Sequence, residues 1–386
     1  MQAILFSFVN VDILPAVSDF LIDNSRPAFY DQKVIFCREI LRHTGGRMNM
    51  MTSREFAELI GVSQATVSRA LNGSPSVCEK TRIYIEQKAE EYGFVLNSQA
   101  RSLKTSKTQT IGVLFPLNFD SLSKNLMFTH ISDQLQRELS RRGYDIMIVY
   151  DHDPQLKSNT FERVIRSGKV DALINFRPQL LEREIDLIEK FHVPFVSLHS
   201  ALQESSLFHQ LMIDEENAGF QIGQYLGRQD GGKYVYVAVS DEPPERSSRM
   251  HGYMKGLASM GKALHEDAIF SAERSTTSAY ETILAHRALF EKEKTSIFVY
   301  NDMMALGVLN ALRELGVDVP GQAQVFGMDD IPLASWFTPR LSTMRSPVRQ
   351  MVGDGCDLLI GLIEGKEIEP QTVYYQSQMI LRDTTR

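Results

Sequence analysis

Apolar residues recur at helical spacing in the part of the chain that follows Met51. They fall at Phe56, Ala57, Leu59 and Ile60. The four residues before them, Thr52 to Glu55, have the spacing of a capping box, in which the hydroxyl caps the first turn and the glutamate reaches back. Gly61 is expected to end the helix. The pattern therefore predicts a first short helix between Thr52 and Gly61.

Two further short helices are predicted directly after the first. Ser63 is placed to cap a second helix over residues 64–71. The run from Ser76 to Glu79 has the spacing of a second capping box, which would open a third helix that ends near Gly93. Three short helices with a tight glycine-containing turn between the first two are typical of a helix-turn-helix unit. An ordinary three-helix bundle would show the same caps and the same period.

The outward side of the second helix separates these two interpretations. Its side chains are polar hydrogen-bonding groups, and none of them is acidic: Gln64, Thr66, Ser68, Arg69 and Asn72. In the major groove of DNA an arginine can read guanine and a glutamine can read adenine. This side of the helix therefore favours DNA binding over a purely structural bundle.

Residues 97–108 connect this unit to the rest of the chain. The segment is basic and poor in apolar residues, and Leu103 is its one apolar side chain that we expect to be exposed. Isolated helices of this length are marginal in water, so we expect the segment to be flexible until it docks. A plain linker is the alternative, and both interpretations can hold together.

Beyond about residue 108, short β-rich runs alternate with amphipathic helical stretches. The expected strands are 110–115, 145–150, 171–176, 194–199, 211–213, 234–239, 295–300 and 323–328. This alternation predicts parallel sheets with helices on both faces. Eight strands are many for one open sheet, so we expect an α/β body of two similar lobes with a ligand cleft between strand ends.

The leading segment, residues 1–50, shows no clear period. Methionines at 48, 50 and 51 stand just before the first helix signal, so our hypothesis is that translation starts at one of them and that the leading segment is absent or unstructured. A genuine extra helix is the alternative. A secretory signal is rejected because Asp12, Asp19 and Asp23 interrupt the apolar stretch and no Lys or Arg precedes Arg26.

Composition sets limits on this picture. The 386 residues are 43% hydrophobic, enough for more than one core, and contain no apolar run of the roughly 18 residues that a membrane span needs. The net charge is −7, yet residues 51–108 hold eight Lys and Arg against six Asp and Glu, so a mildly basic head precedes an acidic body. Cys37, Cys78 and Cys356 are far apart, which is typical of free thiols in a reducing cytoplasm and predicts no metal site.

Residues 57–72, with the sequence AELIGVSQATVSRALN, closely resemble the DNA-binding head of the lactose/galactose repressor (LacI/GalR) family. The match continues in the head at Val77, Lys80-Thr81-Arg82, Gly93-Phe94 and residues 100–104. In the body the family's motifs R-x-x-G, N-D-x-M-A-x-G, G-x-D-D and P-x-L-T-T are matched at residues 249–252, 301–307, 327–330 and 339–343. The resemblance covers about residues 51–386.

For the head, the resemblance implies which residues contact DNA. The positions at which family members read operator bases are occupied by Gln64, Ala65 and Arg69. The positions at which they hold phosphates are occupied by Thr66, Ser68 and Asn72. We expect Ser63, which caps this helix, and Ala100 in the hinge to belong to the same surface. Leu103 falls where the family inserts a leucine into the central minor-groove step, which unstacks that step and bends the DNA.

For the body, the resemblance implies the two-lobed fold of periplasmic sugar-binding proteins, with three crossovers between the lobes. The expected domains are a DNA-binding head at 51–96, a hinge at 97–108, and an effector-binding and dimerisation body at 109–386. We expect the first lobe to hold about residues 109–208 and 342–366, and the second lobe to hold about residues 209–341 and 367–386.

The resemblance also implies an effector site. Arg249, Asn301 and Asp329 match the family's sugar-contacting positions, where donors and an acceptor can hold vicinal hydroxyls. His199 stands at the end of the fourth body strand, where some sugar-responsive relatives carry Asp. Each residue has a structural alternative: a surface ion pair for Arg249, an ordinary loop for Asp329, and a core or rim histidine for His199.

These observations predict a cytoplasmic, homodimeric transcriptional regulator that needs no cofactor. We expect a repressor that binds pseudo-palindromic double-stranded operator DNA and responds to a small-molecule effector, a sugar or sugar derivative. A nucleoside or nucleobase corepressor is the alternative within this class. A sugar-binding receptor without DNA function would leave the head unexplained. An enzyme is disfavoured because the sequence has no phosphate-cradling glycine loop, no G-x-S-x-G and no metal-ligand spacing.

Overall fold

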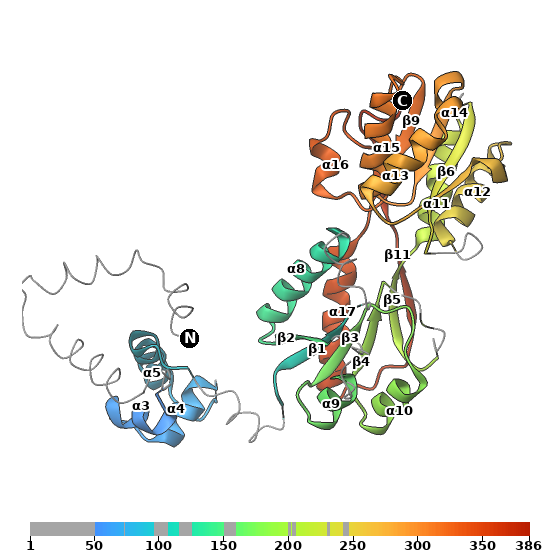
Figure 1. Ribbon diagram of the computed structural model, residues 1–386. Helices are drawn as coiled ribbons and strands as arrows, with labels where there is room; N and C mark the ends of the chain where they lie inside the picture. Colours follow the sequence, from blue (N-terminus) through green and yellow to red (C-terminus); the bar gives the residue numbers. More distant parts are fainter. Residues whose placement is uncertain are drawn as a thin grey trace, which may run out of the picture. The chain divides into compact units, whose positions relative to one another are not determined.

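The computed structural model describes residues 51–72, 74–95, 107–115, 126–149, 160–199, 202, 206–229, 232–241 and 247–386. The chain divides into two compact units, Met1–Arg101 and Ser102–Arg386, here called the head and the body (Figure 1). The predictions for the leading residues 1–50 and for hinge residues 97–106 lie outside the described residues.

The described part of the head consists of α3 (Ser53–Leu59), α4 (Gln64–Leu71) and α5 (Glu79–Tyr92). α3 begins with the predicted capping box. Thr52 Oγ1 accepts a hydrogen bond from the Glu55 amide at 3.3 Å, and Glu55 Oε2 accepts one from the Thr52 amide at 2.7 Å. Ser63 Oγ caps α4 by accepting from the Thr66 amide at 3.1 Å. Both local predictions are confirmed.

The predicted cap of the third helix is wrong. α5 begins at Glu79 after Cys78, which makes no side-chain capping bond. Ser76 Oγ instead lies 2.9 Å from Ser74 Oγ, so its hydroxyl is used within the turn before the helix. Gly93 does end α5, with a φ of +61°, the left-handed conformation that glycine adopts without strain.

A small apolar core holds the three helices of the head together. Phe56, Val67 and Ile85 come one from each helix, and all three are fully buried. The ring of Phe94 stacks on that of Phe56 with centroids 4.1 Å apart. Because Val67 and its neighbour Ala70 face this core, the opposite side of α4 is left to solvent.

The body contains two parallel sheets and a short antiparallel pair. The six-stranded sheet of the first lobe has the order β11 (Thr372–Tyr375), β5 (His209–Ile213), β4 (Phe195–Leu198), β3 (Ala172–Asn175), β1 (Thr110–Leu114) and β2 (Asp145–Val149). The four-stranded sheet of the second lobe has the order β7 (Ile269–Ala272), β6 (Lys233–Val239), β8 (Thr295–Val299) and β9 (Ala323–Phe326). The antiparallel pair is β10 (Thr343–Arg345) and β12 (Gln378–Ile380).

Helices cover both faces of the first sheet. α8 (Leu126–Arg141) and α17 (Val348–Ile363) pack side by side on one face, while α9 (Thr160–Arg166) and α10 (Glu182–Lys190) pack on the other (Figure 1). The side chains of β1 alternate between the two cores, since Val113 faces α8 and α17 and Leu114 faces α9. The predicted α/β arrangement is confirmed.

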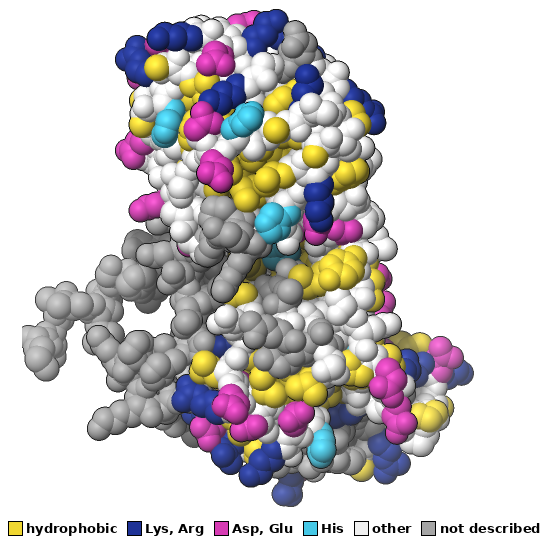
Figure 2. Space-filling view, turned by 90° about the vertical axis from the view of Figure 1, so that its right-hand side faces the viewer, with side chains coloured by type: hydrophobic (Ala, Val, Ile, Leu, Met, Phe, Trp, Pro, Cys, Tyr) yellow, Lys and Arg dark blue, Asp and Glu magenta, His cyan; other side chains and the backbone are white. Residues whose placement is uncertain are grey.

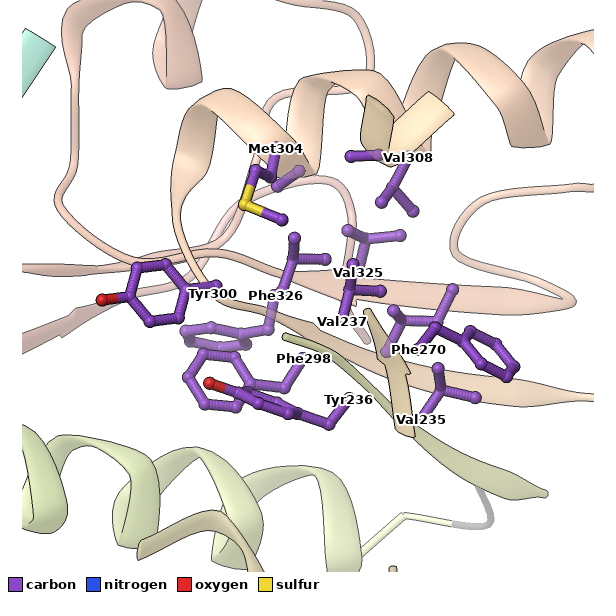
Figure 3. Packing of buried hydrophobic residues seen from close by; sticks show 14 of the residues in the cluster. Val235, Tyr236, Val237, Phe270, Phe298, Tyr300, Met304, Val308, Val325 and Phe326 are labelled. Carbon is purple, nitrogen blue, oxygen red and sulfur yellow. The ribbon is translucent and has the colours of Figure 1, made fainter. Parts of the chain in front are cut away.

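The second lobe has the same layered build. α11 (Glu215–Gly227) packs on α12 (Ser248–Ser259), and α13 (Thr276–Ala285) packs on α15 (Asp302–Glu314). The remaining described helices of this lobe are η3 (Glu266–Ala268), α14 (Arg287–Lys292) and α16 (Pro332–Trp336). Figure 3 shows the core between these layers, where the rings of Tyr236 and Phe298 lie 5.2 Å apart between centroids. Figure 2 shows Lys and Arg interspersed with Asp and Glu over the face that it presents.

Each of the eight predicted strands is present, with ends shifted by at most two residues. Four strands were not predicted: β7, β10, β11 and β12. They hold only three or four residues each, at or below the shortest run by which a strand is recognised in a sequence.

Strand pairing corrects the expected lobe boundaries. β5 pairs with β4 through Val196 and His209, and β11 pairs with β5 through Gln210 and Thr372, so both strands belong to the first sheet. The side chain of Met344, on β10, is buried in the second-lobe core. The expected boundaries at residues 209, 342 and 367 are therefore wrong, and the chain passes between the lobes after β5, after β10 and after β11. Three crossovers are present, as the resemblance implied.

No helix in the described part of the chain is long and apolar enough to cross a membrane.

Candidate functional site

The exposed side of α4 carries the predicted DNA-contacting residues of the head. Side chains on this side are exposed at Ser63, Gln64, Ala65, Arg69 and Asn72, and partly exposed at Thr66 and Ser68. Within the described residues, Gln64 and Arg69 make no side-chain hydrogen bond or ion pair. Both are therefore available to an external partner such as a base edge.

The polar side chains at the two ends of α4 are held in place by local hydrogen bonds. Ser63 Oγ and Thr66 Oγ1 lie 2.7 Å apart at the first turn. At the last turn, Asn72 Nδ2 donates to the Ser68 carbonyl oxygen at 2.6 Å. α4 contains no acidic residue that would repel phosphate. The other two predicted DNA contacts, Ala100 and Leu103, lie outside the described residues.

The predicted effector residues lie at the carboxyl ends of strands from both lobes. Asn301 follows β8 and Asp329 follows β9, at the same edge of the second sheet. Arg249 lies in the first turn of α12. His199 follows β4 of the first sheet. In parallel α/β sheets this edge is where ligands bind.

Arg249 is buried and engaged in three interactions. Its Nη2 lies 2.6 Å from Glu215 Oε1, and its Nη1 donates to the Tyr300 carbonyl oxygen at 2.6 Å. The guanidinium also lies 4.4 Å from the centroid of the Tyr300 ring. Burial is the largest influence on the pKa of Arg249 and works to lower it, but Glu215, Tyr300 and Asp329 together outweigh it and hold that pKa well above its usual value. Arg249 is thus permanently charged and held in a fixed position. Its ion pair with Glu215 is buried on the arginine side, so the alternative of a surface ion pair is wrong.

Tyr300 lies between two arginines. Arg274 lies 4.7 Å from the ring centroid and forms an ion pair with Asp241, with 2.9 Å between Arg274 Nη2 and Asp241 Oδ1. The Tyr300 ring stands at the end of the core cluster, with its hydroxyl directed away from the other labelled side chains (Figure 3). The arginines therefore extend the packed core of the second lobe into a polar site.

Asp329 presents an unsatisfied carboxyl oxygen to this site. Its backbone has a φ of +113°, a rare conformation for a residue with a side chain, and its Oδ1 is buried without a hydrogen-bond partner in the structure. Burial raises the pKa of Asp329 to about 7, against the opposing effect of the nearby Arg249 charge. A carboxyl group in this state can accept from a ligand or, when protonated, donate to it.

The loop around Asp329 is held by its neighbours. Asp302 Oδ2 accepts from the Ile331 amide at 3.0 Å, and Asp302 Oδ1 accepts from Thr343 Oγ1 at 2.6 Å. Asp330 accepts from Arg345 Nε at 2.6 Å and forms an ion pair with Arg382 at 2.5 Å. Of the two adjacent aspartates, Asp330 therefore holds the loop in place through its two arginine partners, and Asp329 faces the site.

Asn301 and His199 complete the group of predicted residues. Asn301 Oδ1 caps α15 by accepting from the Met304 amide at 2.9 Å, so its amide NH₂ is the group that can still serve a ligand. His199 has a φ of +66°, and its Nδ1 is buried without a hydrogen-bond partner in the structure. Burial lowers the pKa of His199, while the charge of Glu215 raises it and those of Arg249 and Arg274 lower it. These charges act on His199 because the first-lobe histidine lies beside the second-lobe cluster.

Glycines fix the distance between Glu215 and Arg249. An added Cβ at Gly219 on α11 would lie 2.2 Å from the Arg249 carbonyl oxygen, and one at Gly252 on α12 would lie 1.9 Å from the Glu216 carbonyl oxygen. Both distances are far below van der Waals contact, so only glycine permits this backbone approach. The close pairing of α11 and α12 holds the carboxylate and the guanidinium together.

Sequence reasoning missed three residues of the site: Glu215, Arg274 and Tyr300. Tyr300 is the last residue of the predicted strand 295–300 and directly precedes the N-D motif, a position from which it could have been proposed. No sequence signal connects Glu215 with Arg249 or Arg274 with Asp241, because each pair forms only through packing of separate elements.

Two cavities in the described structure lie elsewhere on the second lobe. One, of about 480 Å³, is lined by Tyr280, Asn310, Arg313 and Glu314. The other, of about 190 Å³, lies between Leu309 and Pro339 and shares Asn310 and Arg313 with the first. None of the four predicted effector residues lines either cavity.

Across the described residues, no group of His, Cys, Asp and Glu could hold a metal ion.

Two family profiles match the chain. The bacterial regulatory proteins, lacI family, match residues 52–97, and the periplasmic binding protein-like domain matches residues 231–385. The HTH-type transcriptional repressor PurR of Vibrio campbellii is 28% identical over 342 residues, which cover 87% of this chain and 99% of that protein.

Solved structures show the same fold. The lac repressor dimer bound to operator and the anti-inducer ONPF matches with a TM-score of 0.70 and 22% identity, over 87% of this chain and 99% of that one. The complex of the transcriptional regulator CelR with cellobiose matches with a TM-score of 0.61 and 23% identity, over 86% and 99%. The head and the body described above thus occur together in both proteins.

Proposed function

We propose that the chain is a DNA-binding transcriptional regulator of the bacterial lacI family controlled by a small molecule, and that this effector is a carbohydrate bound by the Arg249 cluster. This cluster is defined here as Arg249, Asn301, Asp329 and His199, together with Glu215. A nucleoside or nucleobase is the alternative effector.

The observation that supports this proposal most is the set of unsatisfied polar atoms in the cluster. Arg249 Nε, Asp329 Oδ1 and His199 Nδ1 are buried without hydrogen-bond partners in the structure. A buried polar group without a partner costs about 1–3 kcal/mol. A ligand with several hydroxyl groups would supply a partner to each of these atoms, because a hydroxyl both donates and accepts.

The lobes contribute differently to the proposed site, and this suggests how the effector acts. His199 comes from the first lobe, while Arg249 and Asp329 come from the second. A ligand that contacts all three would favour one arrangement of the lobes. It can shift the equilibrium between arrangements only through unequal affinity for them. The change would reach the DNA through the hinge at residues 97–108.

We further propose roles for the residues of the head. Gln64, Ala65 and Arg69 read operator bases, Thr66, Ser68 and Asn72 hold phosphates, and Ser63 belongs to the same DNA-binding surface. In the hinge, Leu103 enters the minor groove and Ala100 belongs to the same DNA-binding surface. A homodimer then places two heads on the half-sites of a pseudo-palindromic operator and represses transcription. A paired arrangement of this kind follows from the two-fold symmetry of such operators.

One experiment tests this function directly. The full-length protein is used without ligand to select its binding sites from genomic DNA, and operator affinity is then titrated against a panel of sugars and nucleosides. The proposal expects palindromic sites and a sugar that changes operator affinity. A response to nucleosides alone would replace the carbohydrate with the alternative effector, and a lack of any sequence preference would contradict the role of α4.

A further inference from the structure

Each arginine in the effector site is already paired with a carboxylate. Glu215 Oε1 lies 2.6 Å from Arg249 Nη2, and Asp241 Oδ1 lies 2.9 Å from Arg274 Nη2. Asp329 is a third carboxyl group in the same place and forms no ion pair with a described residue. Both described arginines of this site are therefore neutralised by a carboxylate before any ligand binds.

His199 does not change this balance. Burial is the largest influence on its pKa and lowers it, so the imidazole is neutral at pH 7. Neutral imidazole offers one donor and one acceptor nitrogen. The described residues of the site therefore present hydrogen-bonding groups and a surplus of carboxyl groups.

We infer that Glu215 makes this site select an uncharged, donor-rich effector and reject the phosphorylated or carboxylated form of the same compound, an inference that rests on the proposed function of the cluster. A phosphate group could bind Arg249 Nη2 only by displacing Glu215, which would leave a part-buried carboxylate without its partner. At the unpartnered Arg249 Nε it would meet a positive charge that Glu215 already neutralises. Asp329 would repel the same phosphate. A hydroxyl can donate to Asp329 Oδ1 and bond to His199 Nδ1 without breaking either ion pair.

Glu215 is consequently a specificity-determining residue, and the chain offers a matched control beside it. Glu216 is the next residue of α11, and its side chain is 48% exposed and forms an ion pair with Lys255 on the surface. Glu215→Gln and Glu216→Gln remove the same charge from neighbouring positions. Only Glu215→Gln frees the guanidinium of Arg249.

The test uses inorganic phosphate as the probe, because it needs no knowledge of the effector. The thermal midpoint of the full-length protein is measured in millimolar phosphate and in an uncharged buffer matched in ionic strength. Phosphate is expected to raise the midpoint of Glu215→Gln and to leave the wild type and Glu216→Gln unchanged. An Arg249-dependent rise in the wild type, absent from Arg249→Gln, would overturn the inference, as would a Glu215→Gln protein that folds and gains nothing.

A second measurement keeps the inference testable if Glu215→Gln does not fold. Wild-type operator affinity is titrated with sugars and nucleosides and with their phosphate esters. The uncharged member of the active pair is expected to act at a concentration at least about tenfold lower, a difference of roughly 1.4 kcal/mol in binding. A phosphate ester that acts at the lower concentration would overturn the inference and leave the proposed function standing. If no compound of either kind acts, the proposed effector class fails, and the phosphate measurement on the wild type still decides the role of Glu215.

Discussion

Replacing Gly252 by alanine should push α12 away from α11 and break the contact between Glu215 and Arg249 in the effector site. Gly252 lies where α12 approaches α11 most closely, and an added Cβ would lie 1.9 Å from the Glu216 carbonyl oxygen. Ordinary contact needs at least 3.4 Å, so the helices must part by about 1.5 Å. The Glu215–Arg249 contact would then lengthen from 2.6 Å to about 4 Å, beyond hydrogen-bonding distance.

The cost of this change can be estimated from the same geometry. Overpacking a well-packed interior destabilises proteins by about 1–3 kcal/mol, and the clash here is with backbone, which cannot rotate away. We therefore expect a value near the upper end, about 3 kcal/mol. The response of operator affinity to effector should weaken as well, while operator binding without effector should persist because the head is a separate unit.

Gly353→Ala is the matched control for this prediction. Gly353 lies within α17, and a Cβ added there would meet no atom within 4 Å. The substitution should stabilise the protein by up to about 1 kcal/mol, since alanine favours the helix over glycine. Chemical denaturation and effector titration would be measured on both variants. A Gly252→Ala protein as stable and as responsive as the wild type would refute the view that close helix packing positions the site.

Three further predictions concern the head and the site. Arg69→Ala should cost operator binding about 1–3 kcal/mol and relax base preference, measured by competition with random DNA, and equal losses on both DNAs would refute base reading. Thr52→Ala should destabilise the head by about 0.5–2 kcal/mol through loss of the α3 cap, and denaturation of the protein showing no change would contradict the capping role. The raised pKa of Asp329 makes the folded protein bind a proton more tightly than the unfolded chain does, so stability should fall as pH rises from about 4 to about 7, by at most about 1.4 kcal/mol per pH unit. Asp329→Asn should remove this dependence of the unfolding free energy on pH. If denaturation at several pH values shows the same dependence in Asp329→Asn as in the wild type, the pKa of Asp329 is not raised.

Local signals carried most of the secondary structure. Thr52 and Ser63 cap helices as their spacing predicts, because a capping bond involves only residues three apart. The same reasoning failed at Ser76, where the turn offered Ser74 as a competing partner. Short edge strands such as β11 escaped notice because four residues are the shortest run by which a strand is recognised.

Only some of the residues of the candidate effector site could be predicted from the sequence. Arg249, Asn301, Asp329 and His199 could be named through a family resemblance, and the structure brings them together from both lobes. Their roles as effector contacts stay predictions. Glu215 could not be found, because its partnership with Arg249 depends on how closely two helices pack. The lobe boundaries failed for a similar reason, since the sheet that a strand joins is decided by its partners and not by its place along the chain.

The most direct test of the account is the effector response of operator affinity in the wild type and in His199→Ala and Asp329→Ala, one substitution from each lobe. The ligand is the panel compound that shifts wild-type affinity. Both variants should bind operator as the wild type does in the absence of ligand and should lose most of the response to it. Full response at the wild-type ligand concentration in both variants would contradict the claim that this cluster binds the effector.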